Sequence, residues 1–313
     1  MPERREITMP ATASTSMSAR TWAMLLALSV LWGGSFLFIG IAVRELPPLT
    51  LVFARVVIAS AILVGVAVLM RLSFRLTGAI ALTLLGMSVL NNVIPFTLIV
   101  WAQGSIPSGL ASILNATTPL FTVAMLHAAT DEKAGRLKIF GVVIGFLGVA
   151  VMMGRDLGAL GGSALLPQAA VLGAAMSYAL SGLWSRRFAR QGIPPLVAAA
   201  GQLFCSTLLL APLMLVVDRP WLLPIPSLQV TFAVLALALL STALAYILFF
   251  RILALAGATN LSLVTFLIPV SAILLGIVVL NESLNAAQIA GMLLIGMGLA
   301  LIDGRLFRHE EAS

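Results

Sequence analysis

Arg55 is the residue whose type and position point most directly to chemistry. It stands inside a long apolar run, about 12 Å along a helix from Pro47 at 1.5 Å per residue. A cation at that depth in a bilayer is costly and requires a partner. Two roles are open for it: it binds the carboxylate of a substrate, or it donates hydrogen bonds to backbone carbonyls and holds helices together.

Polar and aromatic side chains also recur inside the other apolar runs. Small and polar faces let helices pack closely, so a helix–helix seam is one interpretation of them. The other, which we expect, is a mostly apolar ligand site with aromatic walls and a few polar anchors. The candidate lining residues are Trp32, Ser35, Arg55, Asn91, Asn92, Phe96, Trp101, Ser112, Asn115, Tyr178, Ser181, Tyr246, Ser262 and Thr265. For Trp101, near the end of its run, a position at the membrane interface is an equally good interpretation.

Two of the apolar runs carry a stripe of polar residues at helical spacing that ends in a proline. Ser112 and Asn115 precede Pro119 in one run, and Ser262 and Thr265 precede Pro269 in the other, 150 residues later. A proline inside a helix removes a hydrogen bond and can kink the helix. We therefore expect Pro119 and Pro269, together with Pro95, to kink the helices of a gate.

Few groups suited to catalysis or metal binding stand at membrane depth. Every Asp and Glu lies at the end of an apolar run or between runs, Cys205 is the only cysteine, and His127 and His309 are the only histidines. We therefore expect no catalytic residue, no metal site and no cofactor, which argues against a membrane-embedded enzyme. The lack of a buried carboxylate also predicts facilitated diffusion, or coupling through a group that the sequence does not identify.

The elements that carry these residues are membrane-spanning helices. Of 313 residues, 61% are hydrophobic and 9% are charged, whereas about a quarter of the residues in a soluble protein are charged. A crossing needs roughly 17 to 25 apolar residues. Ten runs meet this length or come close to it: Trp22–Val43, Pro48–Met70, Ala79–Trp101, Pro107–Ala129, Leu137–Met153, Leu165–Trp184, Pro195–Val217, Leu228–Phe250, Ala256–Leu280 and Ala287–Ile302.

The basic residues predict the orientation of these spans. Fourteen of the 18 Lys and Arg residues fall at the termini and in the loops on the side of the termini, and three, Arg44, Arg155 and Arg219, fall on the opposite side. Because basic loops stay inside, both termini are expected in the cytoplasm. The basic residues lie in short groups between apolar runs, without the clustered face that nucleic-acid binding needs.

The sequence also contains a weak internal repeat. Residues 91–154 align with 241–304 without a gap, and Pro119 falls on Pro269 and Glu132 on Glu282. A half with five helices ends on the side opposite its start, so the second half is expected upside down, as in many transporters. Duplication followed by drift, without mechanistic meaning, is the alternative. The expected parts are a disordered cytoplasmic tail 1–20, a first repeat 21–154, a linker 155–164, a second repeat 165–304 and a tail 305–313.

The order and spacing of several short motifs resemble the drug/metabolite transporter superfamily, in particular its EamA-type ten-helix family. The motifs are LWGGSF at 31–36, FAR at 53–55, Pro119, Pro269 and NESL at 281–284 before a glycine-rich last helix. The resemblance covers residues 21–304. It implies ten helices around one central cavity and export of amino acids, related metabolites or drug-like amphiphiles through the bacterial inner membrane.

From residues and resemblance together we expect an all-α membrane protein with two inverted five-helix repeats. Its function is expected to be export of amino acids or related small metabolites by alternating access. The partners are expected to be the substrate and the lipid bilayer, without nucleic acid, and the protein is expected to be a monomer. An exporter of lipophilic drugs or lipids is the alternative, which would need a larger, more apolar cavity.

Overall fold

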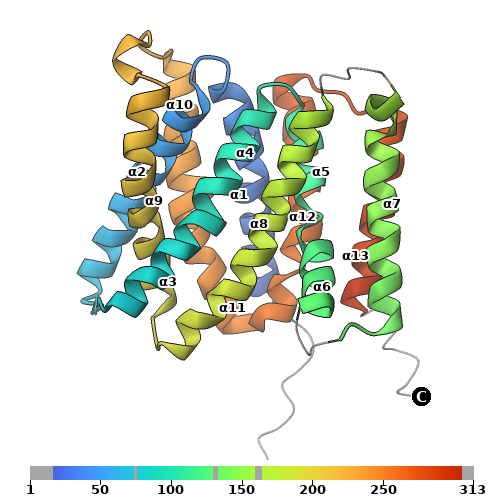
Figure 1. Cartoon of the computed structure of the whole chain (residues 1–313), viewed down its shortest axis with the longest axis horizontal. Helices are drawn as coiled ribbons and strands as arrows, with labels where there is room; N and C mark the ends of the chain where they lie inside the picture. Colours follow the sequence, from blue (N-terminus) through green and yellow to red (C-terminus); the bar gives the residue numbers. More distant parts are fainter. Residues whose placement is uncertain (1–16, 74–75, 130–132, 159–163, 305–313) are drawn as a thin grey trace, which may run out of the picture.

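The computed structural model describes residues 17–73, 76–129, 133–158 and 164–304. In these ranges the regular secondary structure is entirely helical, and the helices lie side by side in one bundle (Figure 1). Most of the expected N-terminal tail, residues 159–163 of the expected linker and the tail 305–313 lie outside the described residues.

Helices follow one another along the chain with short connections. The first half contains α1 (Ala19–Ala42), α2 (Pro48–Leu69), α3 (Gly78–Ser88), η1 (Val89–Val93), α4 (Ile94–Gln103), α5 (Ser108–Asn115), α6 (Thr118–Ala129) and α7 (Arg136–Gly158). The second half contains α8 (Leu165–Arg190), α9 (Pro195–Val217), η2 (Pro220–Leu222), α10 (Leu228–Ala238), η3 (Leu239–Leu244), α11 (Ala245–Leu261), α12 (Val264–Leu280) and α13 (Ala286–Asp303). Because α7 continues to Gly158, the expected linker 155–164 begins inside a helix.

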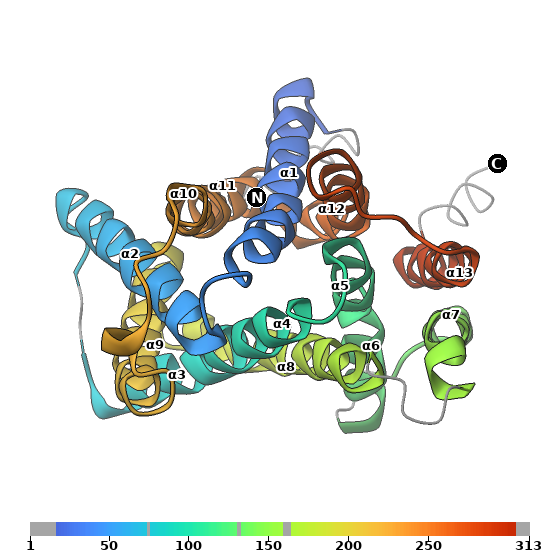
Figure 2. The same ribbon diagram turned by 90° about the horizontal axis from the view of Figure 1, so that it is seen from above.

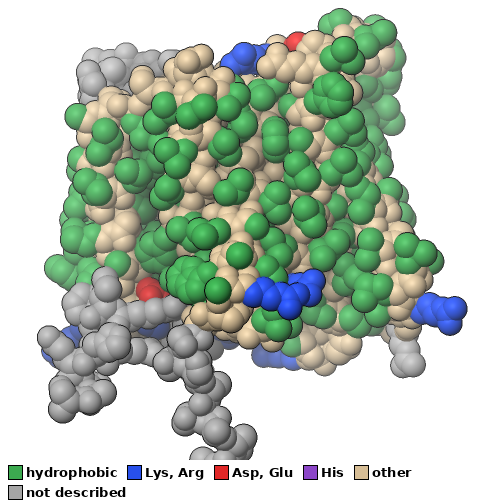
Figure 3. Space-filling view, turned by 180° about the vertical axis from the view of Figure 1, so that it is seen from behind, with side chains coloured by type: hydrophobic (Ala, Val, Ile, Leu, Met, Phe, Trp, Pro, Cys, Tyr) green, Lys and Arg blue, Asp and Glu red, His purple; other side chains and the backbone are tan. Residues whose placement is uncertain are grey.

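The chain is a multi-pass membrane protein. Eight of its described helical segments are long and apolar enough to cross a membrane, where ten were expected. The two that fall short are α12, which has 17 residues, and α8, whose 26 residues include Gln168, Ser177 and Ser181. Figure 3 shows hydrophobic side chains spread across one face of the bundle, with Lys and Arg gathered mainly at one edge of that face.

Two spans widen into a π-helical turn, at positions 150 residues apart. The turns are η1 in the span 78–103 and η3 in the span 228–257. After η1 comes Pro95, which has no N–H to donate back along the helix. In η3 the Thr242 hydroxyl donates to the Leu237 carbonyl oxygen at 2.8 Å. Such turns are frequent at functional sites.

The fourth and ninth expected spans are not continuous helices with matched proline kinks. The fourth breaks at residues 116–117, so Pro119 stands in the first turn of α6, where no helical N–H is required. Thr118 Oγ1 donates at 2.8 Å to the Asn115 carbonyl oxygen, which Pro119 cannot reach with an N–H. Pro269, in contrast, lies inside α12.

Gly257 corrects the start of the ninth expected span. Its φ of 75° and ψ of 170° interrupt α11, a backbone conformation that glycine adopts without a Cβ penalty. The first residues of the expected span 256–280 therefore belong to α11, which ends at Leu261, and α12 begins only at Val264. Hydropathy alone does not mark this turn, because the residues around it are apolar.

Pairs of helices close the two ends of the bundle. Seen from above, α2 packs against α9 at one end and α7 against α13 at the other (Figure 2). Between them α1 packs against α12 and α4 against α8. The apolar core includes Leu51, Leu114, Leu203 and Leu237, each fully buried.

Glycines bring the backbones of α7 and α13 into direct contact. A Cβ on Gly141 would lie 2.6 Å from the Gly298 carbonyl oxygen, and a Cβ on Gly148 would lie 2.7 Å from that of Gly291. Small residues permit such an approach between helices in lipid. The atoms nearest to each added Cβ are backbone carbonyl oxygens. A larger residue at either position could therefore fit only if the two helices moved apart.

Replacing Gly148 by leucine is therefore expected to force α7 away from α13 and to destabilise the protein by about 1–3 kcal/mol, the typical cost of overpacking a tight contact. The thermal unfolding midpoint of the purified protein in detergent measures the effect. Gly154→Leu is the matched control on the same helix, because a Cβ there meets nothing within 4 Å. Equal midpoints for the two variants would contradict the tight seam.

Candidate functional site

Arg55 on α2 points into the bundle and is only 6% exposed. Its Nε donates to Thr242 Oγ1 at 2.9 Å, and its Cζ lies 3.7 Å from the centre of the Phe96 ring. In the part of the chain that the structure describes, no carboxylate pairs with this guanidinium. The side chain thus has a hydroxyl and an aromatic face as neighbours and unused donor capacity.

Asn91 is the hub of the surrounding hydrogen bonds. Its Nδ2 donates to Tyr246 Oη at 2.9 Å and approaches Gln202 Oε1 at 3.5 Å. Its Oδ1 accepts from Ser181 Oγ at 3.1 Å. The π-helical turn η1 places Asn91 and Asn92 so that one span contacts α8, α9 and α11.

Asn92 extends the network toward α9. Its Nδ2 donates to Ser206 Oγ at 3.0 Å, and its Oδ1 accepts from Tyr246 Oη at 3.4 Å. Ser206 in turn donates to the Gln202 carbonyl oxygen at 2.7 Å. Asn92 and Ser206 are both fully buried, so these polar groups are satisfied by one another.

Residues from both halves of the chain form this arrangement. Tyr178 on α8 lies within electrostatic range of Arg55 and Tyr246. Ser241 in η3 has a buried hydroxyl without a hydrogen-bond partner among the described residues. We use the name polar cluster for Arg55, Asn91, Asn92, Phe96, Tyr178, Ser181, Gln202, Ser206, Ser241, Thr242 and Tyr246.

Four candidate residues lie outside the polar cluster. Trp32 on α1 packs against Phe249 with ring centres 5.6 Å apart, in a separate apolar cluster. Ser35 donates to the carbonyl oxygen of Trp32, and Ser112 donates to that of Gly109, so both hydroxyls bond their own helix. Asn115 has a buried Oδ1 without a hydrogen-bond partner, at the end of α5.

Three further candidates do not line the interior as expected. Trp101 is 42% exposed near the end of α4, which agrees with the interfacial interpretation. Ser262 is exposed, and Thr265 Oγ1 donates to the Ser262 carbonyl oxygen at 2.6 Å. The break around Gly257 shifts the helix of this segment, so the face inferred from a continuous helix was wrong.

Four members of the polar cluster are not among the candidate residues of the sequence analysis: Gln202, Ser206, Ser241 and Thr242. A signal for the first two was present, because an amide and a hydroxyl four residues apart fall on one face of a helix. Thr242 aligns with Asn92 at the 150-residue offset, and the repeat could have identified it.

Three carboxylates tie the two halves together from the chain segments that follow α1, α9 and α12, which lie at the upper end of the bundle in Figure 1. Glu282 accepts from Ser108 N at 2.7 Å, Ser108 Oγ at 2.8 Å and Gly109 N at 3.1 Å. Asp218 accepts from Thr50 N at 2.6 Å and Thr50 Oγ1 at 2.9 Å. We call these contacts, with the one made by Glu45, the carboxylate ties.

Glu45 forms the third carboxylate tie. It accepts from the backbone N–H of Ser227, the N-cap residue of α10, at 2.7 Å. That hydrogen bond holds the pKa of the Glu45 carboxyl below its ordinary value. Beside the Glu282 tie lies a cavity of about 310 Å³, which Arg44, Gln103 and Ile106 also line.

The side chains of the polar cluster are suited to binding a small polar molecule by hydrogen bonds and charge. A buried guanidinium offers paired donors to a carboxylate, and the amide and phenol oxygens offer acceptors to an ammonium or hydroxyl group. No group of three or more His, Cys, Asp or Glu residues within the described ranges lies close enough together to hold a metal ion. The cluster itself contains no carboxylate, histidine or cysteine.

Comparison with known proteins supplies a second line of evidence. The EamA-like transporter family model matches residues 20–154 and again residues 166–303. "Uncharacterized transporter YoaV" of Bacillus subtilis is 24% identical over 88% of this chain and 94% of that protein. "Probable amino-acid metabolite efflux pump" of Salmonella typhimurium is 25% identical over 90% of this chain and 94% of that protein.

Two further similarities agree with these. "Uncharacterized inner membrane transporter YedA" of Escherichia coli is 27% identical over 89% of each chain. A solved crystal structure superposes with a TM-score of 0.63 and 18% identity, covering 91% of this chain and 98% of the other. That structure shares the fold, and the names of the sequence relatives indicate transport.

Proposed function

Because the chain belongs to the EamA-like transporter family, we propose that it exports amino acids or related small carboxylate-bearing metabolites across the bacterial inner membrane. Movement is by alternating access, with the substrate held at the polar cluster between the two halves. Both termini face the cytoplasm, so the upper end of the bundle is the outer side.

The observation that carries the proposal is the buried charge of Arg55, which has no carboxylate partner among the described residues. A lone cation inside a membrane bundle is costly, and removing its partner from a buried ion pair costs about 3–5 kcal/mol. A substrate carboxylate would supply the missing partner in bidentate geometry. The site is thus most stable when an anionic group occupies it, which favours carboxylate-bearing molecules over lipophilic cations.

The remaining polar cluster supports an amino acid or a similarly substituted acid. Tyr246 Oη lies 2.9 Å from Asn91 Nδ2, and the amide oxygens of Asn91 and Asn92 already accept hydroxyl hydrogens. Those same oxygens can accept from a substrate ammonium. A similar protein named as a probable amino-acid metabolite efflux pump gives independent support.

Pairwise contacts support ten spans in two inverted repeats related by a pseudo-two-fold axis. At the 150-residue offset the contact of Gly141 with Gly298 becomes the contact of Gly291 with Gly148, and both are present. The turns η1 and η3 correspond in the same way. So do the N-caps Thr77 and Ser227, each of which accepts from the N–H three residues later. Inverted repeats of this kind underlie alternating access.

The absence of a titratable carrier in the polar cluster supports facilitative transport. Proton-coupled transporters commonly use a buried carboxylate or histidine, and the cluster consists of Arg, amides, hydroxyls and aromatic rings. Substrate should therefore move down its own gradient.

Counterflow into proteoliposomes tests the function. Vesicles loaded with one unlabelled amino acid or small organic acid are diluted into the labelled compound, across a panel that includes sugars and lipophilic cations. We expect accumulation for carboxylate-bearing compounds, unchanged when proton and sodium gradients are collapsed. Uptake only of lipophilic cations would overturn the substrate class, and strict dependence on a proton gradient would overturn the facilitative mechanism.

A further inference from the structure

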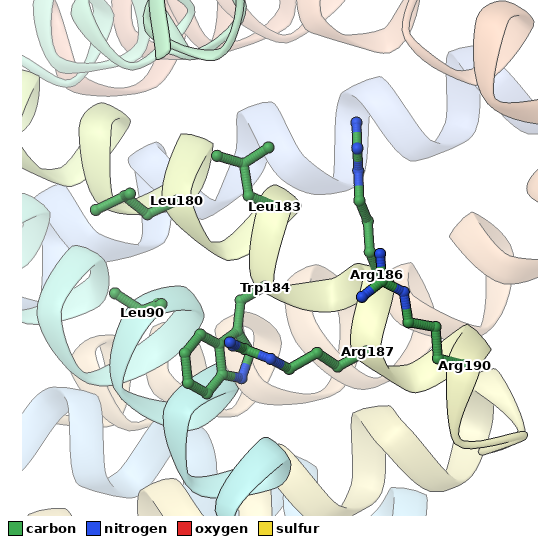
Figure 4. Close-up of a pocket in the computed structure, with 7 residues that line it drawn as sticks. All are labelled: Leu90, Leu180, Leu183, Trp184, Arg186, Arg187 and Arg190. Atoms are coloured by element: carbon green, nitrogen blue, oxygen red, sulfur yellow. The ribbon is translucent and has the colours of Figure 1, made fainter. Parts of the chain in front are cut away.

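A second cavity, which no residue of the polar cluster lines, lies toward the C-terminal end of α8. Its volume is about 270 Å³, and its lining combines three leucines, one tryptophan and three arginines: Leu90, Leu180, Leu183, Trp184, Arg186, Arg187 and Arg190. Figure 4 shows the leucines and the indole on one side of the cavity and the side chains of Arg186 and Arg190 on the other. From this pairing of surfaces we propose that the cavity binds one anionic phospholipid, with the headgroup phosphate at the arginines and an acyl chain along the leucines.

The indole of Trp184 is a fixed platform in this cavity. Its Nε1 donates to the Thr83 carbonyl oxygen at 3.0 Å, and its ring packs against Gly86, where a Cβ would lie 2.3 Å from ring atom Cζ2. Arg187 lies over the same ring, with its Cζ 3.5 Å from the ring centre. Stacking on the ring uses the face of the guanidinium, and the N–H donors lie in the guanidinium plane, so the ring does not occupy them. One arginine is thus pre-positioned for an anionic group.

The apolar wall selects a lipid over a soluble anion. Leu180 is 37% exposed, and Leu90 and Leu183 are half-buried. A dissolved phosphate would use the arginines and leave these leucines unused, whereas an acyl chain covers them. The position also fits, because Arg186 and Arg190 lie at the end of a helix on the edge that we propose faces the cytoplasm, where anionic headgroups attract basic side chains.

Bound lipid would also hold the contact between the halves at this edge. Gln191 Nε2 donates to Thr83 Oγ1 at 3.0 Å, beside the bond from Trp184 to the same residue. The cavity therefore lies directly against a junction of α3 with α8. A lipid in the cavity is expected to stabilise that junction. The thermal unfolding midpoint is therefore a second measurement of lipid binding.

The experiment compares the full chain with a triple variant, Arg186→Gln with Arg187→Gln and Arg190→Gln. Each protein is placed in nanodiscs of phosphatidylcholine that contain increasing phosphatidylglycerol, and bound lipid is counted by native mass spectrometry after release into detergent. The matched control removes the same charge from the same edge, at Lys133, Arg136 and Lys138, all exposed. We expect retained phosphatidylglycerol to fall roughly 100-fold in apparent affinity for the triple variant, since each arginine near the surface contributes about a factor of five. The control should keep it.

Trp184→Leu provides a second variant that keeps every charge. It should weaken retention by removing the platform under Arg187, and phosphatidylglycerol should raise the thermal midpoint of the unaltered protein but not of either variant. Equal losses in the triple variant and the matched control would overturn the site, because bulk attraction alone would explain them. Displacement of the lipid by millimolar inorganic phosphate would overturn the lipid as ligand. Neither result bears on the transport proposed for the polar cluster.

Discussion

Replacing Arg55 by glutamine is expected to lower transport of carboxylate-bearing substrates strongly, while the folded yield stays close to that of the unaltered protein. The guanidinium is 6% exposed and has no carboxylate partner among the described residues. The substitution therefore removes the charge without breaking an ion pair among those residues. Counterflow rates should fall by at least about 30-fold, because truncating one partner of a buried, hydrogen-bonded charge pair costs about 2–5 kcal/mol.

Two companion variants separate binding from folding. Thr242→Val removes the acceptor of the 2.9 Å bond from Arg55 Nε and should lower transport by a smaller factor, since the charge stays. Lys138→Gln is the charge-matched control, because Lys138 is exposed near the start of α7 and belongs neither to the polar cluster nor to the carboxylate ties. An unchanged substrate profile in Arg55→Gln would remove Arg55 from the site. A parallel loss of yield and transport would make its role structural.

Helix positions followed from the sequence where an apolar run is bounded by polar residues. The last span was expected at 287–302, and α13 runs Ala286–Asp303, capped by Asn285 and Gly304. The interruptions were not predicted. Neither the π-helical turns nor the positive φ of Gly257 changes the mean hydropathy of a run, so hydropathy does not predict them.

The polar cluster was predictable in part for a related reason. Arg55, Asn91 and Tyr246 are conspicuous because polar groups are rare at membrane depth, and they do come together. Ser262 and Thr265 were misplaced because their face depends on the local helix register, which the turn at Gly257 resets. The carboxylate ties were missed because loop carboxylates are ordinarily solvated, and only the fold brings them against opposing helix N-termini.

Replacing Glu282 by glutamine is expected to loosen the upper end of the bundle. Its carboxylate accepts three hydrogen bonds from Ser108 and Gly109. Hydrogen bonds to a charged group contribute about 1.5–3 kcal/mol each. The amide keeps one acceptor, so we expect a net loss of about 2 kcal/mol. That loss would shift the equilibrium between an upper end held closed by the Glu282 tie and an upper end that has opened, about 30-fold toward the open state.

Cysteine accessibility measures that shift. Cys205 is the only cysteine, so Cys205→Ala gives a cysteine-free background, and Ile106→Cys places a thiol at a position that is 5% exposed in the cavity beside Glu282. The rate of labelling by a membrane-impermeant maleimide, added on the side that we propose faces outward, reports opening. We expect Glu282→Gln to raise this rate about 30-fold, by the same estimate.

The three carboxylate ties differ in their number of hydrogen bonds, so the labelling rates of the three variants can be compared with one another. Asp218 accepts two hydrogen bonds and Glu45 accepts one, so labelling should increase in the order Glu45→Gln, Asp218→Asn, Glu282→Gln. Loss of one negative charge is common to all three variants and predicts no order. Equal labelling rates in the three variants would therefore show that only the lost charge matters. The graded series would instead identify the ties as the contacts that break when the upper end of the bundle opens to release substrate.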